Sequence, residues 1–191
     1  MILLIAGLVL FLGIHSVAIV APRWRQVQLA RRGEGAWKRL LSVGSLIGFV
    51  LLVYGYAQAR QVAPLLYTPP AGLRHAALLV MLPVFPLLFA AYLPGRIKAA
   101  AKHPMLLAVK LWALAHLLAN GGAADVLLFG SFLVWAVADR ISVKRRGGPV
   151  PALGAPPSAA NDLIALIGGL VVYAVFLLWA HRWLIGVAPL G

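Results

Sequence analysis

Long apolar runs alternate with short polar segments along the whole chain. A helix needs about 20 apolar residues to cross the hydrocarbon core of a bilayer. Runs of about this length predict six membrane spans, at 2–21, 37–58, 73–92, 104–121, 124–138 and 163–183. The pattern therefore predicts an all-α fold, a polytopic membrane helix bundle that forms one domain over residues 1–191.

Proline and glycine refine this plan at three places. Pro83 and Pro86 lie inside the third span, where they predict a kink. The Gly121-Gly122 link is short, so we expect the fourth and fifth spans to form an antiparallel hairpin. The segment 139–160 is basic at first and then rich in proline and glycine, which predicts a flexible cytoplasmic loop.

The composition of the chain is that of a membrane protein rather than of a soluble domain. Hydrophobic residues make up 63% of the 191 residues and charged residues 11%, against about 45–50% and 25% in soluble domains. The net charge of +13 raises the question of nucleic acid. The basic residues instead bunch between apolar runs, so we expect membrane lipids as partners and no nucleic acid. The chain has no cysteine, which excludes disulfides and thiolate metal sites.

The distribution of basic residues predicts the orientation of the spans. The loops after the first, third and fifth spans hold six, three and four of the 17 Lys and Arg, whereas the opposite side holds Arg60, Arg74 and Arg182. Cytoplasmic loops of membrane proteins carry such an excess. Both termini are therefore expected outside the cytoplasm, in the periplasm if the membrane is a bacterial inner membrane.

Two of the five histidines fall deep inside predicted spans, which makes them candidate functional residues. His15 lies in the first span and His116 in the fourth, whereas His75 and His181 lie near span ends and suit an interfacial position. At 1.5 Å per residue, the two deep histidines differ in depth by about 8 Å. They could hydrogen-bond to each other. Alternatively, two imidazoles could ligate a haem, whose macrocycle supplies the other four iron ligands.

Two further residues are candidates for the same site. Lys110 lies within the fourth span, seven residues after His103, so both point the same way on a helix. Lys110 could extend its ammonium to the cytoplasmic surface or meet an anionic group such as a haem propionate. His103 precedes Pro104 at the cytoplasmic boundary, where it could cap the helix or contact a headgroup. We therefore list His15, His116, Lys110 and His103 as candidate cofactor-binding residues and His15 and His116 as candidate metal ligands.

The sequence resembles the NnrU family along essentially its whole length. The resemblance rests on four motifs: Leu12-Gly13-Ile14-His15-Ser16, Pro94-Gly95-Arg96-Ile97-Lys98 through His103-Pro104, the run 111–121 with sequence LWALAHLLANG, and Asp139-Arg140 through Lys144-Arg145-Arg146. Membership implies a bacterial inner-membrane protein associated with nitrite and nitric oxide reduction. The family itself resembles the plastid 15-cis-zeta-carotene isomerase, a membrane enzyme that contains haem b.

The second resemblance implies a haem site. The two histidines proposed as haem ligands in the isomerase match His15 and His116. A cysteine proposed there as an alternative axial ligand corresponds to Ala113, so this chain lacks the residue for ligand exchange. Three functions stay open: a haem b protein that senses or handles nitric oxide or passes electrons, a haem enzyme acting on an apolar lipid, and a metal-free scaffold or permease. The ligand would be a small gas or an apolar lipid, and the oligomeric state is open.

Overall fold

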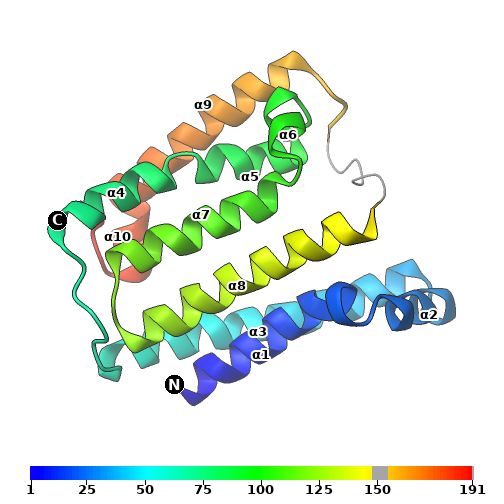
Figure 1. Ribbon diagram of the computed structural model, residues 1–191, viewed down its shortest axis with the longest axis horizontal. Helices are drawn as coiled ribbons and strands as arrows, with labels where there is room; N and C mark the ends of the chain where they lie inside the picture. The colour runs from blue at the N-terminus through cyan, green and yellow to red at the C-terminus, as the bar shows by residue number, and fades with distance from the viewer. Residues whose placement is uncertain (148–154, 191) are drawn as a thin grey trace. The chain divides into compact units, whose positions relative to one another are not determined.

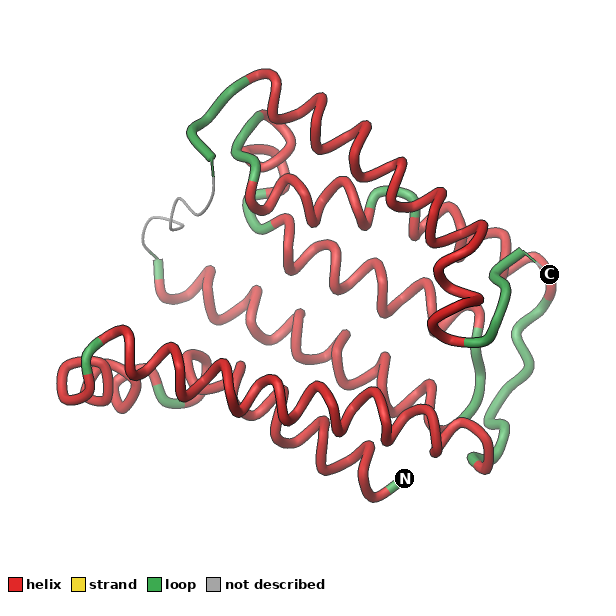
Figure 2. Tube along the Cα trace, turned by 180° about the vertical axis from the view of Figure 1, so that it is seen from behind, coloured by secondary structure: helices red, strands yellow, loops and turns green. Residues whose placement is uncertain are grey.

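The computed structural model describes residues 1–147 and 155–190, and helices dominate them (Figure 1). Within this part of the chain no strand forms, and Figure 2 shows only helices and loops. The prediction of an all-α fold is confirmed. The elements are α1 (Ile2–Val20), α2 (Pro22–Arg32), α3 (Glu34–Val62), α4 (Ala71–Met81), α5 (Val84–Tyr92), α6 (Arg96–Ala101), α7 (Pro104–Ala119), α8 (Ala123–Arg146), α9 (Ala159–Val175), the π-helical turn η1 (Phe176–Ala180) and α10 (His181–Ile185).

Helix boundaries differ from the sequence prediction at the basic segments. The first loop contains a helix of its own, α2, whose proline occupies the first turn and whose end is set by Gly33 at φ 74°. The predicted fifth span ended at residue 138, but α8 continues to Arg146 and stops at Gly147, which has φ 59°. Residues 139–146 are therefore helical rather than a loop. Residues 148–154 of the predicted loop lie outside the described residues.

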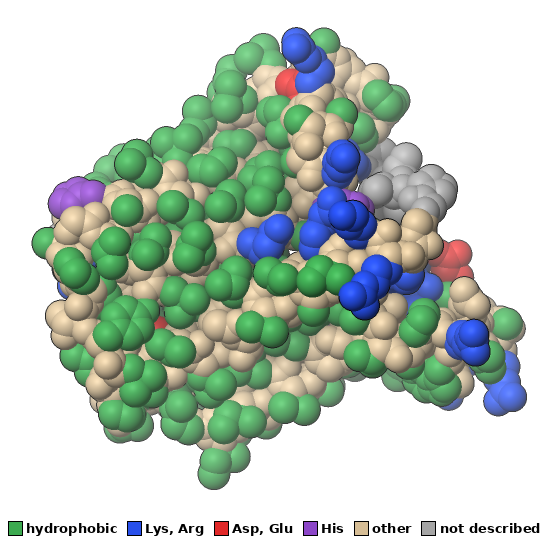
Figure 3. Space-filling model, viewed as in Figure 1, with side chains coloured by type: hydrophobic (Ala, Val, Ile, Leu, Met, Phe, Trp, Pro, Cys, Tyr) green, Lys and Arg blue, Asp and Glu red, His purple; other side chains and the backbone are tan. Residues whose placement is uncertain are grey.

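Five segments are long and apolar enough to cross a membrane by length and composition: Ile2–Val20, Glu34–Val62, Ala71–Tyr92, Ala123–Arg146 and Ala159–Ile185. Hydrophobic side chains cover much of the face that Figure 3 displays. The remaining apolar helix, α7, has 16 residues, which corresponds to about 24 Å. A sixth crossing, and the side on which each end lies, stay predictions.

Packing divides the chain into two compact units, each described here by itself. Unit 1 holds Met1–Pro70 and His116–Gly147, and unit 2 holds Ala71–Ala115 and the described part of residues 148–191. In unit 1, α1 packs along α3, and both contact α8. In unit 2, α5 packs along α9, which also contacts α6. A single domain over 1–191 stays a prediction.

Glycine permits the close pairing of α1 with α3 in unit 1. A Cβ on Gly7 would lie 2.6 Å from the backbone nitrogen of Leu52, and one on Gly48 would lie 2.9 Å from that of Phe11. Gly55 approaches the backbone of Leu4 equally closely. Small residues let helix backbones approach in this way in membranes, where packing drives association. The glycines of α1 and α3 therefore mark a close helix contact.

In unit 2 the third predicted span is interrupted at Pro83, and a side chain bonds to a backbone carbonyl that the interruption frees. Pro83 interrupts the helix, and the amide of Leu82 bonds to Leu79 O at 3.3 Å rather than continuing the α-helical pattern. The carbonyl of Leu78 instead accepts a hydrogen bond of 2.9 Å from the hydroxyl of Tyr173. Backbone groups freed by proline in a membrane need such a partner. The predicted kink at Pro83 is therefore confirmed.

Candidate functional site

His15 lies near the C-terminal half of α1, where its ring is held by its own helix. Its Nδ1 lies 2.7 Å from the carbonyl oxygen of Phe11, one turn earlier. A carbonyl oxygen only accepts, so Nδ1 carries the hydrogen and donates it. The other nitrogen, Nε2, then has the free lone pair. Since His15 is exposed on α1, this lone pair is available to a ligand.

Aromatic side chains surround the His15 ring. The ring of Phe11 lies 4.3 Å from it, and that of Trp135 meets it edge-on at 6.1 Å. Phe132, one turn before Trp135 on α8, lies 5.8 Å from Phe11. The indole Nε1 of Trp135 is buried and has no hydrogen-bond partner among the described residues. The Nε1 of Trp37 is buried and without a partner among the described residues in the same way.

His116 lies in the last turn of α7, and its ring stacks on Phe129 of α8 at 4.4 Å and 25°. Side chains satisfy the carbonyl groups that this helix end leaves open. The amide of Asn120 donates to His116 O at 3.0 Å, and the hydroxyl of Tyr67 donates to the carbonyls of Leu117 and Asn120. Burial raises the pKa of Tyr67, which keeps its hydroxyl protonated and donating. The helix end that carries His116 is thus fixed.

The structure places both deep histidines in unit 1 and packs both against α8. Their contacts, Phe129 for His116 and Trp135 for His15, are six residues apart. Six helical residues correspond to about 9 Å along the axis, close to the offset of about 8 Å expected from the sequence. Both rings therefore contact aromatic residues of α8, at different levels along that helix. No group of three or more metal-binding side chains occurs in the described residues.

The other two candidate residues lie in unit 2. His103 precedes α7 at its N-terminal end, and its carbonyl accepts a hydrogen bond of 3.1 Å from Leu107 N. Lys110 is half-buried in the middle of α7. The role of both residues toward a cofactor stays a prediction.

A polar contact that the sequence did not predict lies at the start of α8. Asp125 caps the helix by accepting from Gly122 N at 3.0 Å. Its other oxygen accepts from the hydroxyl of Tyr56 at 2.5 Å. Tyr56 lies 69 residues earlier in α3, so no local pattern could have revealed the pair. The segment after α3 is fixed nearby, because Leu66 N donates to Gly121 O at 2.8 Å.

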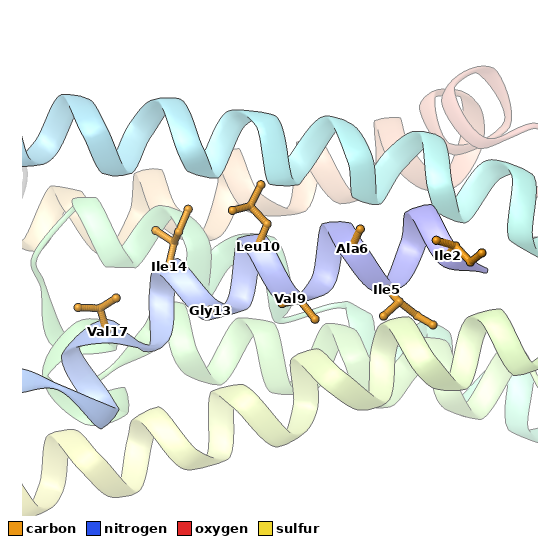
Figure 4. A pocket seen from close by; sticks show the side chains of 8 residues that line it. All are labelled: Ile2, Ile5, Ala6, Val9, Leu10, Gly13, Ile14 and Val17. Carbon is orange, nitrogen blue, oxygen red and sulfur yellow. The ribbon is translucent and has the colours of Figure 1, made fainter.

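A shallow apolar groove of about 660 Å³ follows α1, and all the residues that line it belong to that helix: Ile2, Ile5, Ala6, Val9, Leu10, Gly13, Ile14 and Val17 (Figure 4). His15 is not among them. A surface formed by one apolar helix suits the acyl chains of a surrounding membrane. The groove carries no polar side chain that could orient a substrate.

Comparison with known proteins bears on the family. No curated protein and no solved structure matches the chain. The family model described as NnrU protein matches residues 3–189, which include both units and both deep histidines. The chain therefore belongs to the NnrU family.

Proposed function

We propose that this NnrU-family protein binds haem b in a bacterial inner membrane, with His15 and His116 as the iron ligands, and that it takes part in nitrite or nitric oxide reduction. The nitrogen-oxide role comes from the family resemblance alone. When bound, haem supplies a redox-active iron that binds small gases. The residues of unit 1 would hold and orient it.

The observation that carries the proposal is the hydrogen bond from His15 Nδ1–H to Phe11 O, 2.7 Å long. Ligating histidines commonly donate their other N–H to a backbone carbonyl, which fixes the tautomer and the ring orientation. Here the bond leaves Nε2 unprotonated and exposed on an apolar helix. An unpaired polar atom in hydrocarbon is unfavourable by several kcal/mol, on the order of 2–7, so a ligand for Nε2 would stabilise the protein.

The surroundings of the two histidines fit a large apolar group with an anionic edge. Phe11, Phe129 and Phe132 supply flat apolar surface beside the two imidazoles. The buried Nε1–H of Trp135 has no partner among the described residues and could donate to a carboxylate. Haem b combines these properties, since its macrocycle is apolar and its propionates accept hydrogen bonds.

Ala113 favours this proposal over the isomerase alternative. It is fully buried in α7, and it stands where the resemblance implies a cysteine for ligand exchange. A methyl group cannot ligate iron. Two fixed histidine ligands instead suit a site that passes electrons, or one from which an imidazole is displaced by a gas.

The test is the haem content of the purified full-length chain, measured as the pyridine haemochrome after expression with ample haem. We expect about one haem b per chain, a large loss in His15→Ala and in His116→Ala, and no loss in His75→Ala. His75 is an exposed histidine on α4 and serves as the matched control. A colourless wild-type protein would overturn the proposal, as would equal haem content in all four proteins.

A further inference from the structure

A second groove lies at the end of unit 1, where the C-terminal ends of α1 and α8 meet. Its volume is about 500 Å³. One part of its wall is apolar and contains Ile19, Pro22 and Ile141. Arg145 and Arg146 line another part. The groove therefore joins an apolar surface to two guanidinium groups within a few helical turns.

The charged side chains that line this groove are both positive, Arg145 and Arg146. Residues 139–146 of α8 contain four basic residues and one acid, Asp139. Arg146 contacts that acid at 3.5 Å. A pair of this length is weak, and one carboxylate cannot balance the four basic side chains of this segment. An anionic occupant is therefore favoured.

The apolar wall narrows the class of anion. Ile19 lies at the end of the first span and Ile141 follows the last apolar residues of α8, so the groove opens at the level where a span ends. A soluble phosphate ion would gain nothing from the isoleucine side chains. A phospholipid would place its phosphate at the guanidinium groups and its acyl chain along the apolar wall.

We infer that this groove is a binding site for an anionic phospholipid, whose phosphate is held by Arg145 and Arg146 and whose acyl chain packs on Ile19 and Ile141. Guanidinium groups suit this role because they bind phosphate oxygens through two parallel N–H donors. Neither His15 nor His116 lines the groove, so the lipid site does not rest on the haem proposal. It would also hold the ends of α1 and α8 together from outside.

The experiment uses the full-length chain in nanodiscs and counts the lipids that remain bound, by native mass spectrometry. Phosphatidylglycerol is compared with phosphatidylcholine. We expect phosphatidylglycerol to be retained preferentially, and its apparent affinity to fall about tenfold or more in Arg145→Gln/Arg146→Gln, because each basic residue contributes separately to binding. Ile141→Ser should weaken binding of both lipids.

The matched control is Arg31→Gln/Arg32→Gln, which removes the same charge from the end of α2, outside the groove. This variant should keep its preference for phosphatidylglycerol, and excess glycerol 3-phosphate should not displace the bound lipid. Equal losses in the two double variants would indicate diffuse attraction to charge and overturn the site. Displacement by glycerol 3-phosphate, or equal retention of phosphatidylcholine by the wild type, would also overturn it. Haem content, measured in parallel, should stay unchanged.

Discussion

The two units each depend on one close helix pair, but they achieve it differently. In unit 1, α1 and α3 are continuous helices, and glycines on both bring their backbones into contact. In unit 2, Gly169 approaches the backbone of Pro86, a residue of the helix that follows the break at Pro83. Continuous helices need only small side chains to pair. A broken span also needs polar side chains that satisfy its freed backbone groups, which Tyr173 supplies here.

The units also differ in where buried polar groups lack a partner. Both use side chains to satisfy backbone carbonyls: Tyr67 and Asn120 at the end of α7 in unit 1, and Tyr173 and Asn161 at Leu78 and Pro94 in unit 2. Among the described residues, the buried side-chain nitrogens without a hydrogen-bond partner are the indole Nε1 atoms of Trp37 and Trp135, and both lie in unit 1.

Replacing a glycine at the contact of α1 with α3 should cause the largest loss of stability. Gly7→Leu places a side chain against the backbone of Leu51 and Leu52, which cannot move aside. Overpacking of this kind destabilises by about 1–3 kcal/mol or more, and we expect the upper part of this range. Gly13→Leu on the same helix is the control, since nothing lies within 4 Å of its Cβ. Thermal unfolding in detergent measures both, and equal midpoints would contradict the packing described.

Removing the hydroxyl of Tyr56 should cause the next largest loss of stability. Tyr56→Phe removes one of two donors to the Asp125 carboxylate and leaves the Gly122 amide. Hydrogen bonds to charged groups contribute about 1.5–3 kcal/mol, so a loss near 2 kcal/mol is expected. Tyr54→Phe removes a solvent-exposed bond to Gln58 and should cost much less. Chemical unfolding followed by tryptophan fluorescence compares the two, and the reverse order would refute this account of α8.

The smallest loss of stability is expected when the hydrogen bond at the interrupted span of unit 2 is removed. Tyr173→Phe removes the donor to Leu78 O. Side-chain hydrogen bonds in membranes average about 0.6 kcal/mol, so we expect a loss of about 0.5–1 kcal/mol. Tyr92→Phe, an exposed tyrosine at the end of α5, is the control. Amide hydrogen exchange of residues 78–82 should also be faster in Tyr173→Phe. Unchanged exchange there would show that the hydroxyl does not stabilise the backbone around Pro83.

The sequence predicted the elements well wherever hydrophobicity alone decides them. Apolar runs located the long helices, and Pro83 indicated the break between α4 and α5. The basic segments were predicted poorly, because hydropathy falls at residue 139 while helix propensity persists until Gly147. The depth of His15 and His116 was readable from the sequence. Phe11, one turn before His15, was readable as well. Trp135 was not, since it lies 120 residues after His15 and only folding brings the two rings together.

The central claim is that His15 and His116 are both ligands of one haem, and rescue by imidazole tests it most directly. His116→Gly and His15→Gly each remove one imidazole and leave the helix in place. The account predicts a low-spin spectrum in the wild type, loss of that spectrum in either variant, and its return on addition of free imidazole, with no change in His75→Gly. A wild-type protein that binds no haem, or a low-spin spectrum that survives both glycine replacements, would contradict the account.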